Sequence, residues 1–244
     1  ADKIFSAATV SGGTELRIWE GRTGAPLTPP QRLGENIDLA AWSPDGTKVA
    51  TGASDGKARL WDATKLEEVC QLAQPPRVAG SLVFSPDGKF IAGATSDQGV
   101  MFWDASTGAQ LGDALPHSGT PLRIAFSRDG HRLATACQDG SVRVWSVPDG
   151  KLQAGPMSHE GSCWVAAFSP DGLKLLSASS DGTARLWDAA SGKPLLPPLR
   201  HESAVFWVAF SPDGRAFATS TDAGQVRVWE TASGRLMSGP MRHP

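Results

Sequence analysis

The amino-acid sequence predicts an all-β protein in which one small unit of antiparallel strands is repeated along the chain. The first observation is a series of tryptophans at a constant interval of 42 residues: Trp19, Trp61, Trp103, Trp145, Trp187 and Trp229. The second is a turn, Ser-Pro-Asp-Gly or Ser-Arg-Asp-Gly, that recurs in five copies, and the third is the absence of helical periodicity. A strict period of this length indicates one supersecondary unit, each copy burying its apolar face against the next.

The copy that begins at Met157 shows how the unit is built. Its segments with strand character are 163–168, 174–178, 183–187 and 194–199. Turns rich in Ser, Pro, Asp and Gly separate them, because Pro presets φ and Gly tolerates positive φ. The prolines of the last segment cannot donate to a ladder, so this strand is expected at a sheet edge. Repeated units of four antiparallel strands are typical of β-propeller blades.

Composition and charge exclude several functional classes. The chain has 244 residues and a net charge of −2, so no overall basic field favours nucleic acid or an anionic membrane. No apolar run approaches the roughly 18 residues of a membrane span, and the N-terminus lacks the pattern of a signal peptide. Cys70, Cys137 and Cys163 have no paired spacing. They predict free thiols in a reducing, cytoplasmic location.

Trp-Asp pairs complete the pattern of the repeat. They occur at 61–62, 103–104 and 187–188, and drift to Trp-Glu or Trp-Ser elsewhere. With the turns and the period, they resemble the WD40-repeat family over essentially the whole chain. The amino-acid sequence of residues 192–201 resembles bacterial WD40 arrays. The resemblance implies a WD40-type β-propeller in a single domain, 1–244, with five complete four-stranded blades plus three strands of a further blade. The implied repeats lie near 1–31, 32–73, 74–115, 116–157, 158–199 and 200–244.

The positions of the repeats suggest about six blades or part of a larger ring. The first copy begins after the place of its first strand, and His243 falls at the start of a copy that then stops. Three explanations are open: a fragment of a longer propeller, an engineered or truncated chain, and an unusual incomplete six-bladed ring. Because open strand edges invite pairing with another chain, we expect self-association or a complementing strand at the incomplete blade.

In WD40 blades a His, a Ser or Thr, an Asp and the repeated Trp form a hydrogen-bonded structural chain. The matching residues here are His117, Thr135, Asp139 and Trp145; His159, Ser177, Asp181 and Trp187; and His201, Thr219 and Trp229, with Asp222 displaced by one residue. Leu33 and Pro75 replace the His in the second and third copies, and Gly93 replaces the hydroxyl in the third. We therefore expect two complete networks and weaker ones elsewhere, because a broken network leaves costly unpaired groups.

Ser177, His159 and Asp181 also have the residue types of a hydrolase triad. The set recurs from blade to blade, however, and no copy has the signature of a nucleophile elbow. The same spacing places the repeated histidines in different blades, which argues against a metal site, and no P-loop signature is present. We expect no catalytic residue, metal or cofactor.

Four residues depart from the repeat on the face where partners of WD40 propellers often bind. Trp164, Phe206, Trp207 and Arg123 are expected on three adjacent blades. Aromatic and Arg side chains are enriched in interface hot spots, so these four are candidates for contact with a protein or peptide. The alternative is that the aromatics fill the core between blades and that Arg123 is an ordinary solvated side chain.

The leading hypothesis is a noncatalytic scaffold that presents a rigid face to a protein or peptide. One alternative is a sensor or regulatory domain cut from a larger bacterial signalling protein that carries a kinase or nucleotide-switch domain. Another is an engineered or truncated propeller without a native ligand. An enzyme is least favoured, because fold alone never excludes catalysis but no site here argues for it.

Overall fold

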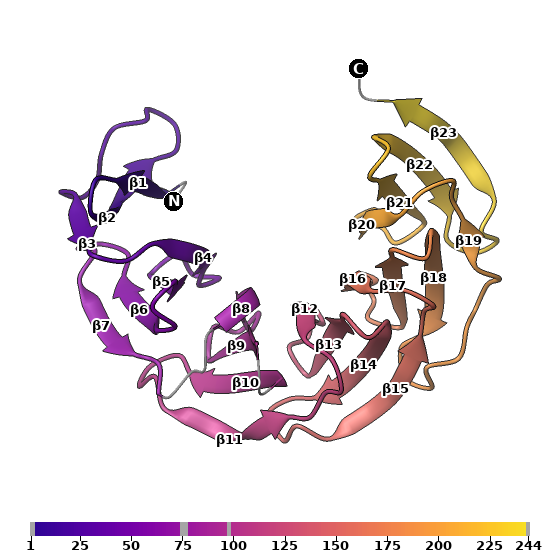
Figure 1. The fold of residues 1–244 in the computed structure, drawn as a ribbon, viewed down its shortest axis with the longest axis horizontal. Coiled ribbons are helices and arrows are strands. Elements are labelled where there is room, and N and C mark those ends of the chain that lie inside the picture. Colours follow the sequence, from indigo (N-terminus) through magenta and orange to yellow (C-terminus); the bar gives the residue numbers. More distant parts are fainter. Residues whose placement is uncertain (1–2, 74–77, 97–98, 243–244) are drawn as a thin grey trace. The chain divides into compact units, whose positions relative to one another are not determined.

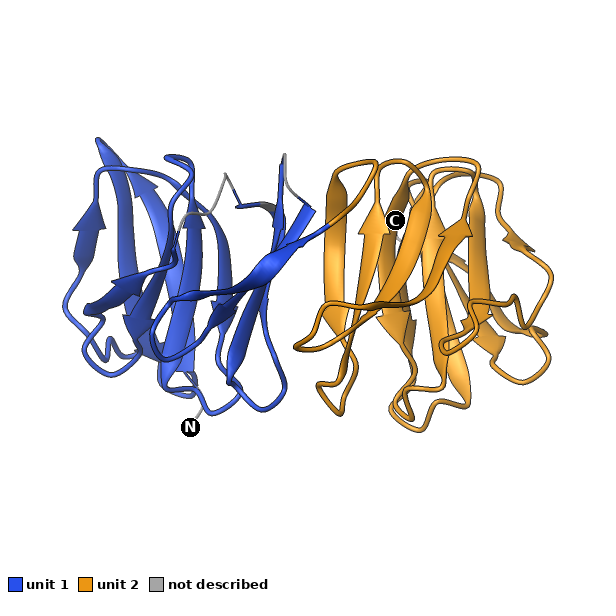
Figure 2. Cartoon of the chain, turned by 90° about the horizontal axis from the view of Figure 1, so that it is seen from below, with its two compact units in different colours: residues 1–115 blue, residues 116–244 orange. Residues whose placement is uncertain are grey.

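The computed structural model describes residues 3–73, 78–96 and 99–242, which form strands and turns (Figure 1). The chain divides into two compact units, residues 1–115 and residues 116–244 (Figure 2). The described ranges contain no helix that is long and apolar enough to cross a membrane.

Unit 1 consists of three antiparallel sheets, named blades 1 to 3. Blade 1 contains β1 (Lys3–Val10), β2 (Gly13–Glu20) and β3 (Gln31–Leu33). Blade 2 contains β4 (Ile37–Trp42), β5 (Lys48–Ala53), β6 (Ala58–Asp62) and β7 (Glu68–Gln71). Blade 3 contains β8 (Val78–Phe84), β9 (Phe90–Thr95), β10 (Gly99–Asp104) and β11 (Gln110–Leu115).

Unit 2 consists of blades 4 to 6, each with four strands. Blade 4 contains β12 (Pro121–Phe126), β13 (Arg132–Cys137), β14 (Ser141–Ser146) and β15 (Leu152–Ser158). Blade 5 contains β16 (Cys163–Phe168), β17 (Lys174–Ser179), β18 (Thr183–Asp188) and β19 (Leu199–Arg200). Blade 6 contains β20 (Val205–Phe210), β21 (Ala216–Thr221), β22 (Gln225–Glu230) and β23 (Leu236–Arg242). These sheets, with the three strands of blade 1, confirm the predicted fold class.

The recurring turn joins the first two strands of a blade by hydrogen bonds of its own residues. Ser169 Oγ donates to Asp171 Oδ1 at 2.5 Å and accepts the Lys174 N–H at 2.9 Å. Gly172 has a φ of 71°, a left-handed conformation that favours glycine. The Ser-to-Asp bond recurs in the turns that begin at Ser43, Ser85, Ser127 and Ser211. The repeated sequence therefore closes the same hairpin in each of these copies.

The core of unit 2 lies between successive blades. Ala134, Val142 and Val144 of blade 4 are fully buried and belong to one cluster with Leu175 and Trp187 of blade 5. The next junction is built from Val165, Leu176, Leu186, Phe217 and Trp229. Each large apolar side chain buried in this way stabilises the fold by roughly 1.5–3 kcal/mol. The sequence period is therefore a period of packing between sheets.

The proline-rich end of blade 5 differs from the predicted continuous strand 194–199. Pro194 forms an isolated bridge with Trp187, and regular pairing resumes only at Leu199, opposite Ala184. Pro197 and Pro198 lie exposed between these two points. Since proline has no N–H to donate, these residues interrupt the ladder instead of extending it.

Two expectations stay predictions: a single domain over 1–244, and self-association at the incomplete blade. His243, which marked the start of a further copy in the sequence, lies outside the described residues, as does Pro75.

Candidate functional site

The indole N–H of each repeated tryptophan is held by a hydrogen bond. Five of these tryptophans donate to a hydroxyl at 2.7 to 3.2 Å: Trp19 to Ser6, Trp61 to Thr51, Trp145 to Thr135, Trp187 to Ser177 and Trp229 to Thr219. A buried indole N–H without an acceptor is costly, so the Ser or Thr on the neighbouring strand supports the packing of the ring.

Blade 3 satisfies its tryptophan in another way. Trp103 donates to the Ala73 carbonyl at 2.9 Å, because Gly93 stands in the hydroxyl position. A Cβ atom at Gly93 would lie only 2.8 Å from the Trp103 ring. The glycine therefore makes room for the indole, and a backbone carbonyl replaces the missing hydroxyl.

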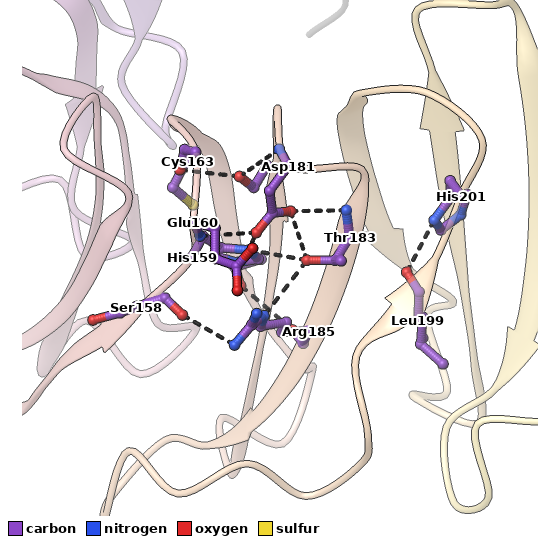
Figure 3. A network of polar contacts seen from close by, with 12 residues as sticks. Ser158, His159, Glu160, Cys163, Asp181, Thr183, Arg185, Leu199 and His201 are labelled. Carbon is purple, nitrogen blue, oxygen red and sulfur yellow. Dashed lines mark hydrogen bonds and ion pairs between the residues drawn. The ribbon is translucent and has the colours of Figure 1, made fainter.

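In blade 5 the hydrogen-bonded chain runs from an acid to the indole. His159 Nδ1 lies 3.2 Å from Asp181 Oδ2, and His159 Nε2 lies 2.7 Å from Ser177 Oγ, which accepts the Trp187 N–H at 2.8 Å. Figure 3 shows His159 beside Asp181 and Thr183. Because the carboxylate only accepts, Nδ1–H is assigned as the donor and Nε2 as the acceptor. Burial lowers the pKa of His159 to about 4, so the imidazole is neutral at pH 7.

Blades 4 and 6 contain related chains. In blade 4 His117 Nε2 lies 2.9 Å from Thr135 Oγ1, and the Asp139 carboxylate accepts hydrogen bonds from the amide and hydroxyl of Ser141. In blade 6 His201 Nε2 lies 2.8 Å from Thr219 Oγ1. There, His201 Nδ1 lies 3.0 Å from the Leu199 carbonyl, which takes the place that Asp181 has in blade 5.

The Ser-His-Asp set of blade 5 has no access to a substrate. Ser177 is fully buried, the His159 side chain is 0% exposed, and the Ser177 hydroxyl is engaged by both His159 and Trp187. A nucleophile must reach the atom that it attacks. In the described part of the chain, no group of three or more His, Cys, Asp or Glu could hold a metal ion. The geometry therefore favours a structural role for this set.

The four residues that depart from the repeat lie on the first strands of blades 4 to 6. Trp164 of β16 stacks on Phe206 of β20, with ring centroids 5.1 Å apart and an interplanar angle of 14°. The Arg123 guanidinium of β12 lies 5.7 Å from the ring centroid of Trp207, also on β20. Phe206 is 46% exposed and Trp207 51% exposed, and Trp164 is half-buried. The structure brings the four together as one surface, named the aromatic patch.

The first strands of blades 4 to 6 each contain a β-bulge near these side chains. The pairing with the second strand shifts between Cys163 and Val165 in blade 5, and between Val205 and Trp207 in blade 6. Trp164 and Phe206 are the extra residues at these bulges, and such residues leave the regular alternation of a strand. Phe206 and Trp207 are both at the surface, whereas Val165, at the Trp207 position of blade 5, is buried although its strand has the same bulge. For Phe206 and Trp207 this exposure argues against a purely core role.

A second surface feature was not anticipated from the sequence. A cavity of about 420 Å³ lies at the outer edge of blade 5, lined by Arg185, Trp187 and residues 194–198. The proline-rich segment 194–198 was the only sign of this cavity in the sequence, but it predicted an edge strand and no cavity. The cavity forms where the prolines interrupt that strand.

Comparison with known proteins identifies the repeat. The WD domain, G-beta repeat family matches residues 34–62, 76–104, 113–146, 150–188 and 193–230, more than half of the chain. The chain belongs to the WD40 family. WD40 proteins are generally noncatalytic scaffolds for protein interactions.

Several curated WD40 relatives match shorter stretches. Periodic tryptophan protein 2 homolog of Dictyostelium discoideum is 38% identical over 50 residues, and THO complex subunit 3 of Arabidopsis thaliana is 37% identical over 60. Coronin-7 of Pongo abelii is 35% identical over 64 residues. These matches cover 20%, 25% and 26% of this chain, and 5%, 19% and 7% of the respective relatives. The three relatives are eukaryotic and lend no support to the expected bacterial resemblance.

Proposed function

We propose that this chain is a noncatalytic protein-interaction scaffold and that the aromatic patch of unit 2 is its contact surface for a protein or peptide. Membership of the WD40 family supports the general role. The particular surface is supported by one observation: Phe206 and Trp207, neighbours on β20, are each about half exposed and each contact a residue from another blade.

Exposed aromatic side chains in contact with one another are suited to binding. They supply a large apolar area with few rotatable bonds, so little conformational entropy is lost when a partner covers them. The stack of Trp164 on Phe206 and the contact of Arg123 with Trp207 hold these side chains before a partner arrives. The three first strands come from sheets that are packed against each other, which makes the patch rigid.

Selection from a phage-displayed library of random peptides tests this function. The protein is immobilised, and recovered peptides are measured against the protein and its Trp207→Ala variant by fluorescence anisotropy. We expect the variant to lose binding by about tenfold or more, the usual effect of truncating an aromatic hot spot.

Leu173→Ala is the matched control. Leu173 is 62% exposed and follows the turn at the opposite end of β16 from Trp164, so its removal leaves the patch intact. Circular dichroism checks that both variants fold. The proposal fails if no selected peptide depends on Trp207, or if Leu173→Ala weakens binding equally.

The free thiols support a second, separate proposal, a reducing compartment such as the cytoplasm. Cys137 and Cys163 are buried, and Cys70 is partly buried.

A further inference from the structure

We propose that the aromatic patch recognises an extended peptide in which an acidic residue and a large apolar residue are two positions apart, so that their side chains lie on one face. This inference rests on the proposed function and adds the chemistry of the partner. It starts from the hydrogen-bond donors of the patch.

Arg123 contacts an aromatic ring but has no hydrogen-bond acceptor among the described residues. Its guanidinium carbon lies 5.7 Å from the centroid of the Trp207 ring, a cation–π contact that does not use the N–H groups as hydrogen-bond donors to a polar acceptor. Among the described residues, no carboxylate lies within ion-pair distance of Arg123 and no acceptor takes its N–H groups. Arg123 is exposed, so these donors are accessible to a partner.

The other arginines that stack on aromatic rings differ from Arg123 in this respect. Each also has an acceptor or an acidic neighbour: Arg17 pairs with Glu15 at 2.8 Å, Arg132 lies 4.0 Å from Asp129, and Arg185 donates to the Ser158 carbonyl at 3.1 Å. Among the described arginines that contact an aromatic ring, Arg123 is thus the one whose N–H donors have no acceptor within the protein and can bind a ligand.

Trp164 adds a second donor without an acceptor. Its Nε1 is buried and has no hydrogen-bond partner in the described structure, unlike the indole N–H groups of the six repeated tryptophans. Because Trp164 Nε1 is buried, the donors of the patch that a ligand can reach are those of Arg123. An acceptor-bearing, negatively charged group is the complementary ligand, and a carboxylate matches the fork of a guanidinium.

The exposed rings set the second requirement. Phe206 and Trp207 remain about half exposed after their contacts with Trp164 and Arg123, so a partner must supply an apolar group to cover them. The guanidinium lies 5.7 Å from the centre of the Trp207 ring. Side chains two residues apart in an extended peptide lie on one face, about 7 Å apart. The spacing fits a peptide of the form acidic–any–aromatic or aliphatic, in either direction.

The test uses the 244-residue chain and the phage-displayed peptide library. We expect Asp or Glu two residues from a large apolar residue to be enriched among the recovered peptides. A fluorescent synthetic peptide with this pattern is then titrated by anisotropy. Arg123→Gln is expected to raise its Kd by about tenfold or more, as expected for loss of a charge-assisted hydrogen bond, and Arg123→Lys by less. Raising the salt from about 50 to 500 mM should weaken wild-type binding more than that of Arg123→Gln.

Arg128→Gln is the matched control. Arg128 is an exposed arginine in the turn at the far end of β12, so it shares the charge of Arg123 but not its place in the patch. Its removal should change the Kd by less than about twofold, because exposed charges separated by more than a Debye length are largely screened.

The outcomes separate this inference from the proposed function. Peptides that require Trp207 but show no acidic enrichment, or that ignore Arg123→Gln, overturn the acidic ligand and leave the interaction surface standing. Failure to recover any Trp207-dependent peptide overturns both. A second arm compares peptides that lack Asp and Glu and end in a free carboxylate or an amide. Binding that requires only the free terminus would replace the side-chain carboxylate by a terminal one and refute the motif.

Discussion

Replacing Ser177 by alanine is expected to lower the free energy of unfolding by about 2–6 kcal/mol. The Ser177 hydroxyl lies 2.7 Å from His159 Nε2 and 2.8 Å from Trp187 Nε1, and all three residues are at most 7% exposed. Alanine leaves the Trp187 donor and the His159 acceptor without partners in a site that water cannot enter. An unsatisfied buried polar group costs about 1–3 kcal/mol, and two such groups give the stated range.

The assay is urea unfolding followed by far-ultraviolet circular dichroism. Hydrogen exchange with mass spectrometry assigns the loss of protection to β16–β18, because two compact units need not unfold in one step. Ser177→Thr is the matched control, since Thr135 and Thr219 hold the same position in blades 4 and 6 with the same partners. A loss below about 1 kcal/mol for the alanine variant, or equal losses for both, would refute the reasoning.

Three further predictions concern buried groups. Burial lowers the pKa of His159 from 6.5 to about 4, so the unfolded chain binds a proton that the folded chain does not. The stability contributed by this neutral imidazole is complete above pH 6.5 and is lost as the pH falls toward 4, by up to about 3 kcal/mol. Urea titrations at pH 7 and pH 5 should therefore show a smaller drop in the free energy of unfolding for His159→Gln than for the wild-type protein. An equal drop in the two proteins would contradict this prediction. Gly93→Ala should destabilise unit 1 by about 1–3 kcal/mol in the same assay, because the new Cβ would lie 2.8 Å from the Trp103 ring; an unchanged midpoint would show that the ring moves freely. Burial raises the pKa of Cys163, so an aromatic disulfide reagent should label Cys70 in the native protein and Cys163 only after unfolding, and rapid native labelling of Cys163 would contradict its burial.

Most of the fold was predictable because its determinants are local and repeated. The tryptophan period, the turn of the Ser169 type and the alternation of short apolar segments act within about forty residues. The sequence of each copy therefore predicts the same arrangement of strands without reference to the others. The outer strand of blade 5 was predicted less well. Leu199 pairs as expected and Arg200 extends the strand by one residue, but regular pairing is interrupted between Pro194 and Leu199.

The candidate site was predictable only as a set of residues. Departures from the repeat singled out Trp164, Phe206, Trp207 and Arg123. Their contacts with one another could not be derived from the repeat, which describes each blade alone. The stack of Trp164 on Phe206 and the reach of Arg123 to Trp207 both cross from one blade to another.

The sequence by itself determined the family, the four-stranded unit and the hydroxyl groups that support Trp145, Trp187 and Trp229, because spacing along the chain controls contacts within a hairpin. Only the tertiary structure decided which side chains meet between blades, which aromatic rings stay exposed and which donors lack an acceptor. Those properties depend on the packing of whole sheets and on bulges that turn a side chain toward or away from the core. In unit 2 that packing leaves Arg123 held by a ring and without a counter-charge among the described residues.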